Sequence, residues 1–187
     1  MCLSPEPLVP HWQDHYIKAY RFAALAHNGQ KVPDTDIPYL MHLSLVSMEV
    51  IASFAAGPGR DCALAVQCAL LHDVIEDTAT TYEQVLETFG QQVADGVQAL
   101  TKDERLPTKQ EQMADSLRRI KEQPSEVWMV KLADRITNLQ PPPSYWTLEK
   151  KKKYQAEAVA ILNALGDASP YLAARLRGKI ETYDEYF

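Results

Sequence analysis

One helical segment is apolar around nearly its whole circumference and then ends in a cluster of acids. The run from Ala63 to Leu71 contains a single polar residue, Gln67. A helix of this kind has no face that suits water, so it belongs in the middle of a fold. We expect it to extend from Cys62 to Asp77, with amphipathic helices covering it on several sides.

The rest of the chain predicts such helices, and no segment shows the alternation of a strand. Apolar residues recur at helical spacing in several stretches, and glycine and proline separate them. We expect further helices at 12–27, 39–56, 82–90, 91–100, 108–122, 125–139, 147–165 and 170–186, with a capping box at Thr80 to Glu83. The sequence therefore predicts an all-α bundle of about eight to ten helices, in one domain over residues 1–187 with an irregular arm at 1–10.

Composition excludes several classes of protein. The 187 residues are 46% hydrophobic and carry a net charge of −6, which suits a compact domain and argues against a general nucleic-acid binder. No apolar stretch approaches the roughly 20 residues that span a membrane, and no signal-peptide pattern is present. Three cysteines without a CxxC pair fit a reducing compartment. We expect a cytoplasmic protein with a small-molecule partner, and its oligomeric state stays open.

Four ionisable residues close the central helix: His72, Asp73, Glu76 and Asp77. Residues four apart share a helix face, so His72 would lie above Glu76 and Asp73 above Asp77. Three carboxylates this close repel one another and oppose the helix macrodipole. A divalent cation bound by His72 and Asp73 would supply the missing positive charge. The alternative is a solvated helix end whose acids face water.

A further acid, Asp134, lies in another apolar helical stretch. A buried carboxylate needs a partner because its desolvation is costly. Two interpretations are open. Asp134 either forms an ion pair with Lys131 or Arg135, or it binds a metal ion, with Asn138 pointing into the same site.

The remaining histidines are less informative. His42 follows a proline that starts a helix, and it could complete a shell of two histidines and two aspartates. His27 could also be a ligand, but a lone histidine at the end of an amphipathic helix is more often a capping or packing residue. We expect no role for His11 and His15.

The order of His42, His72-Asp73 and Asp134 resembles that of the HD phosphohydrolase superfamily. The surrounding segments narrow the resemblance to the hydrolase domain of RelA/SpoT-type proteins, and to the stand-alone small alarmone hydrolases above all. These segments are Ala26–Gln30, Pro38–His42, Ala69–Thr78, Phe89-Gly90 and Lys131–Arg135. The most specific part is the HDVIEDT segment followed by KLADRITN at this spacing.

The resemblance implies an HD phosphohydrolase that removes the 3′-pyrophosphate of (p)ppGpp-like nucleotides with one Mn²⁺ ion. The metal ligands that it implies are His42, His72, Asp73 and Asp134. It also implies that Glu76 and Asp77 position or deprotonate the attacking water. A mixed histidine and carboxylate shell suits Mn²⁺, although Fe, Zn and Ni fit the same ligands.

Other positions imply contacts with the nucleotide. Asn138 would contact the ribose or the metal site. Lys150 and Tyr154 resemble the basic residue and the tyrosine that hold the 5′-phosphates. The neighbouring lysines, Lys151 and Lys152, are better explained as a solvated helix face.

Two departures from the family pattern leave the base of the substrate open. The family usually carries a basic pair after Gln30, but here only Lys31 could pack on the base. The family often has a lysine just after the position of Thr101, and here either Lys102 or Arg105 could supply that cation for the substrate. An adenosine analogue, (p)ppApp, therefore stays open, as does a phosphorylated dinucleotide such as NADPH. An HD nucleotidase for simple monophosphates and a catalytically inactive scaffold that binds an alarmone or a partner protein also stay open.

Overall fold

The computed structural model describes residues 11–56 and 60–187, and within these ranges the chain is helical. The α-helices are α1 (Trp12–Ala26), α2 (Leu40–Phe54), α3 (Cys62–Leu71), α4 (Val74–Asp77), α5 (Tyr82–Phe89), α6 (Gln91–Leu100), α7 (Lys109–Lys121), α8 (Ser125–Asn138), α9 (Leu148–Leu165) and α10 (Pro170–Thr182). Two 3₁₀ helices follow α9 and α10, and the described ranges contain no strand, only an isolated bridge between Lys31 and Pro38. The all-α prediction is confirmed, whereas the predicted arm at 1–10 lies outside the described residues.

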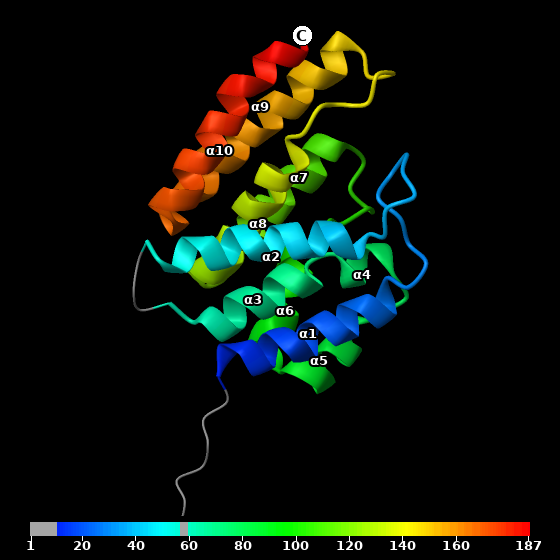
Figure 1. Ribbon diagram of the computed structural model, residues 1–187, viewed down its shortest axis with the longest axis vertical. Coiled ribbons are helices and arrows are strands. Elements are labelled where there is room, and N and C mark those ends of the chain that lie inside the picture. The colour runs from blue at the N-terminus through cyan, green and yellow to red at the C-terminus, as the bar shows by residue number, and fades with distance from the viewer. Residues whose placement is uncertain (1–10, 57–59) are drawn as a thin grey trace, which may run out of the picture.

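Helix α3 occupies the centre of the fold, as its apolar sequence predicted. It packs against α1, α2, α6 and α8, and every residue from Leu64 to Leu71 is buried. Helices α9 and α10 lie side by side at the opposite end of the molecule from α1 and α5, and α8 connects them to the rest (Figure 1). No helix in the described part of the chain is long and apolar enough to cross a bilayer.

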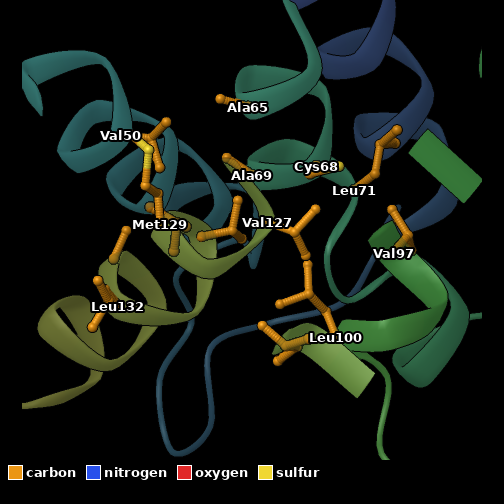
Figure 2. Packing of buried hydrophobic residues seen from close by; sticks show 14 of the residues in the cluster. Val50, Ala65, Cys68, Ala69, Leu71, Val97, Leu100, Val127, Met129 and Leu132 are labelled. Atoms are coloured by element: carbon orange, nitrogen blue, oxygen red, sulfur yellow. The ribbon is translucent and has the colours of Figure 1, made fainter. Parts of the chain in front are cut away.

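Small side chains allow the central helices to approach one another closely. Cys68 and Ala69 of α3 are fully buried, and Figure 2 shows them in the same core as Val127 of α8 and Val97 of α6. Where α6 meets this core it carries Gly96. A Cβ atom at that position would lie 2.9 Å from Sγ of Cys68 and 2.9 Å from a methyl group of Val127.

The central helix ends earlier than the sequence predicted. Helix α3 stops at Leu71, His72 and Asp73 form a turn, and the short α4 begins at Val74. Nδ1 of His72 donates a hydrogen bond of 2.8 Å to the carbonyl oxygen of Ala69. In a continuous helix this carbonyl would accept from the backbone N–H of Asp73, so the imidazole competes with the next helical turn. The prediction of one helix from Cys62 to Asp77, with His72 above Glu76, is therefore wrong.

The other predicted helices agree with the structure to within a few residues at each end. The capping box before α5 is formed by Thr81 and Gln84, one residue later than predicted. The last helix ends at Thr182, and a 3₁₀ helix continues from Tyr183 to Tyr186.

The close packing of Gly96 against Cys68 and Val127 predicts that an alanine at this position destabilises the fold, although alanine favours a helix more than glycine does. We expect Gly96→Ala to lower the free energy of unfolding by about 1 kcal/mol, because overpacking a core costs about 1–3 kcal/mol and exceeds the helical gain. Gly178→Ala on α10 is the matched control, since a Cβ atom at that position would have nothing within 4 Å. This control should gain about 0.5–1 kcal/mol. Urea unfolding measures both, and equal stabilisation of the two variants would contradict the close packing.

Candidate metal centre

Four side chains from three parts of the fold converge on one point. His42 lies on α2, His72 and Asp73 form the turn between α3 and α4, and Asp134 lies on α8. The Nε2 atoms of His42 and His72 are 3.3 Å apart. Oδ1 of Asp134 lies 3.5 Å from Nε2 of His42, and Oδ2 of Asp73 lies 2.9 Å from Nε2 of His72. The structure thus brings together all four residues that the sequence grouped as ligands.

This donor set fits a divalent cation. The exposed fraction is 8% for His42, 3% for His72 and 8% for Asp134. One donor atom from each of these three residues lies within 4.8 Å of the others. Imidazole and carboxylate donors that converge this closely suit a divalent transition-metal ion better than Mg²⁺ or Ca²⁺, which prefer oxygen ligands alone.

The pKa shifts of the clustered side chains also indicate that positive charge is stabilised at this site. Burial opposes the charge on His72, but the carboxylates of Asp73 and Asp134 outweigh this and raise the pKa of His72 to about 9. Burial would also raise the pKa of Asp73, but the facing imidazole of His72 holds it well below its usual range. The pKa of Asp134 is likewise lowered, against its burial, by Lys131 and by the two histidines.

Outer hydrogen bonds hold the carboxylates in place. The hydroxyl of Tyr39 donates to Oδ2 of Asp73 at 2.5 Å. Oδ1 of Asp134 accepts from Nδ2 of Asn138 at 2.5 Å, and its Oδ2 accepts from Nζ of Lys131 at 3.1 Å. Partners of this kind orient metal ligands. Tyr39 was not among the residues that the sequence singled out, although its position three residues before His42, at the start of the same helix, could have indicated it.

Asp134 therefore combines features of both interpretations that the sequence left open. It forms an ion pair with Lys131, and it also faces the two histidines. Arg135 points elsewhere and lies 3.5 Å from a carboxylate oxygen of Glu157.

Two more acids, Glu76 and Asp77, lie on the short helix α4 that follows this cluster. Glu76 accepts hydrogen bonds from the backbone N–H of Lys102 at 3.0 Å and from its Nζ at 2.5 Å. Oδ2 of Asp77 accepts from Nε2 of Gln30 at 3.3 Å. Burial and the neighbouring charge of Asp73 raise the pKa of Asp77 above its ordinary value.

The residues expected to contact a nucleotide differ in their surroundings, and some are paired with other side chains. Nζ of Lys150 lies 4.2 Å from the ring centroid of Trp146, and the ring of Tyr154 lies over the guanidinium of Arg135 at 4.3 Å. Lys31 is exposed and pairs with Asp36 at 2.5 Å. The side chain of Arg105 is 90% exposed and bonds to Asp103, so the structure does not bring it into the cluster.

Two loops on the same side of the fold are tied together. The hydroxyl of Tyr145, in the connector before α9, donates to Oδ2 of Asp34 at 2.7 Å. Asp34 lies in the loop between α1 and α2, and both segments lie at the right edge of Figure 1. This contact places the proline-rich connector beside the loop that carries Lys31.

An all-helical fold that assembles histidine, histidine-aspartate and aspartate in this chain order is the arrangement of HD-domain proteins. The family profile described as "HD domain" matches residues 19–170. The chain belongs to this family.

Within this family, the chain is similar to proteins named as guanosine-3′,5′-bis(diphosphate) 3′-pyrophosphohydrolases. The chain is 30% identical over 165 residues to the Xenopus tropicalis protein named guanosine-3′,5′-bis(diphosphate) 3′-pyrophosphohydrolase MESH1, with 86% of this chain and 89% of that protein covered. It is 35% identical over 164 residues to an Aquifex aeolicus guanosine-3′,5′-bis(diphosphate) 3′-pyrophosphohydrolase, but covers only 22% of that longer protein. A solved structure described as a metazoan ortholog of SpoT that hydrolyzes ppGpp superposes with a TM-score of 0.77 at 26% identity, covering 94% of this chain and 98% of that one.

The raised pKa of His72 predicts how the stability of the metal-free protein depends on pH. The ordinary value of 6.5 rises to about 9 in the folded state. The proton on His72 therefore stabilises the fold fully below pH 6.5, and this contribution is lost as the pH rises through 9. Unfolding midpoints in the presence of a chelator should fall over this window in the wild type and fall less in His72→Gln. Equal pH dependence in the two proteins would contradict the assignment.

Proposed function

We propose that this protein is a metal-dependent hydrolase that removes the 3′-pyrophosphate from ppGpp-like nucleotides. The observation that carries the proposal is the pairing of the buried donor cluster with the carboxylates of Glu76 and Asp77 on the next turn of the chain. The relatives that this chain spans almost completely are named for this activity, which supports the same substrate class.

In this proposal four residues hold one divalent cation, and we assign Mn²⁺ from the mixed donor set. They are His42, His72, Asp73 and Asp134. When bound, such an ion lowers the pKa of a water molecule and offsets charge on the phosphoryl oxygens. Tyr39, Lys131 and Asn138 would keep the two aspartates oriented, since each donates to one of their carboxylate oxygens.

Glu76 and Asp77 act on the attacking water. A base accepts a proton more readily when its pKa lies closer to the working pH, and the pKa of Asp77 is raised by burial and by Asp73. Its Oδ2 is engaged by Gln30, so we assign the transferred proton to Oδ1. Glu76, held by the backbone and side chain of Lys102, would orient the water.

The remaining contacts with the nucleotide follow from charge. Lys150, on the first turn of α9, offers a cation for the 5′-phosphates, and Tyr154 would contact the same phosphates. Asn138 would contact the ribose or the metal site. Lys102 is committed to Glu76, and Lys31 is paired with Asp36. Lys31 is the cation expected next to the base, and its charge is already neutralised by Asp36. The contact therefore does not favour guanine or adenine, and the assay below compares substrates with each base.

We take residues 1–187 as one HD domain that acts in the cytoplasm. Cys62 and Cys68 are both free thiols in the structure, which suits a reducing compartment.

The first test of the proposed function is release of pyrophosphate. Chelator-treated protein should be inactive, and Mn²⁺ should restore release from ppGpp or ppApp, with NADPH and simple monophosphates as comparison substrates. Asp134→Asn should lower turnover by more than about 100-fold, because even residues outside the ligand shell cost 10–100-fold. Asn163→Ala, far along α9, is the matched control. No release from ppGpp or ppApp at any Mn²⁺ concentration would refute the proposal.

A second test separates the water-activating pair from the metal ligands. Glu76→Gln combined with Asp77→Asn should keep Mn²⁺ affinity within a few fold but lower kcat by about 10²–10⁴-fold, the range of general acid–base catalysis. Calorimetric titration with Mn²⁺ and single-turnover kinetics measure the two effects. Full activity in the double variant would remove both residues from the mechanism.

A further inference from the structure

His27 is buried but takes no part in the donor cluster. It caps the end of α1 with an exposed fraction of 4%, and its ring stacks on that of Tyr39 with centroids 5.1 Å apart. Nδ1 of His27 lies 2.6 Å from Oε1 of Gln30. Among the described residues, Nε2 of His27 has no hydrogen-bond partner.

Gln30 connects this histidine to the acid that we assign to the water. Its Nε2 donates to Oδ2 of Asp77 at 3.3 Å, across 47 positions of sequence. The backbone of Gln30 is fixed at both ends: its N–H donates to the carbonyl oxygen of His27 at 3.0 Å, and its carbonyl oxygen accepts from the N–H of Tyr39 at 2.9 Å. Gly29, with φ of +82°, allows the turn that brings Gln30 to this place.

The direction of these hydrogen bonds is determined by Asp77. A carboxylate accepts only, so the amide of Gln30 must present its NH₂ group to Asp77 and its oxygen to His27. His27 must then carry a proton on Nδ1. With the proton there, Nε2 is a bare acceptor, and its lack of a partner among the described residues leaves no buried N–H of this ring unsatisfied.

We propose that His27 and Gln30 are positioning residues for Asp77, forming a chain from Nδ1 of His27 through the amide of Gln30 to Oδ2 of Asp77. The proposal rests on the role proposed above for Asp77. The chain fixes which oxygen of Asp77 faces the attacking water, and packing against Tyr39 fixes the ring of His27. It links the end of α1 to α4, and it meets the ligand set where the backbone N–H of Asp77 donates to the carbonyl oxygen of Asp73 at 2.8 Å.

The tautomer of His27 tests the chain without any turnover. In the metal-free protein labelled with ¹⁵N, long-range ¹H–¹⁵N spectra should show the proton of His27 on Nδ1, exchanging slowly with water. Gln30→Ala should make this proton exchange at least about tenfold faster, because it loses its acceptor. A proton on Nε2 in the wild type would overturn the proposal.

Kinetics test the consequence. Gln30→Ala and His27→Phe should each lower kcat by about tenfold, since misplacing a reacting group by a fraction of an ångström is costly, while KM and Mn²⁺ affinity stay within about twofold. His27→Phe keeps a ring for Tyr39 but has no donor. His27→Asn, which restores an N–H donor near the position of Nδ1, should recover part of the loss. Asn28→Ala, exposed and adjacent, is the matched control.

A double-mutant comparison excludes a purely structural role. In the Asp77→Asn background, Gln30→Ala should cause no further loss of kcat, because its effect acts through Asp77. Additive losses, or an unchanged kcat in Gln30→Ala while the wild type turns over, would overturn the proposal. An inactive wild type would instead refute the proposed function, and the tautomer of His27 would still decide whether the chain exists.

Discussion

The close packing of α3 against α2 and α8 is what makes the polar site possible. The donor atoms of His42, His72 and Asp134 come from three parts of the fold, so they meet only if those helices approach within side-chain reach. Small buried residues such as Ala65 and Ala69 allow that approach (Figure 2). An ion pair between the buried Glu49 and Arg175 further holds α2 against α10. The apolar core therefore positions the charged groups.

The cost of the site is electrostatic. Gathering Asp73 and Asp134 beside two histidines in a largely buried place leaves a negative charge that the protein must balance. In the absence of an ion the balance comes from Lys131 and from a proton held by His72, whose pKa rises to about 9. A divalent cation would replace that proton, so metal binding and loss of the proton should be coupled. The net charge of −6 gave no hint of this local demand for cations.

Periodicity predicted the helices, and motif order grouped four residues that the structure brings together. Periodicity did not predict the break at His72, because a side chain that takes the carbonyl of Ala69 from the next helical turn leaves no trace in the hydrophobic pattern. It is this break, and not one long helix, that places Glu76 and Asp77 in a separate turn. Contacts between individual side chains were harder still to predict from the sequence. Either Lys102 or Arg105 was expected to supply a cation for the substrate, but the pairing of Lys102 with Glu76 and the contact of Tyr39 with Asp73 were not expected. Such contacts join segments that are distant in sequence, so a pattern within one segment contains no information about them.

The metal site is tested most directly by electron spin-echo spectroscopy of the protein loaded with one equivalent of Mn²⁺. If the packing of α2, α3 and α8 builds the site, the bound ion should show hyperfine coupling to two imidazole nitrogens. One of these couplings should disappear in His42→Asn and the other in His72→Asn, while the fold is kept. A bound Mn²⁺ without nitrogen coupling, or with couplings that survive both substitutions, would contradict the site.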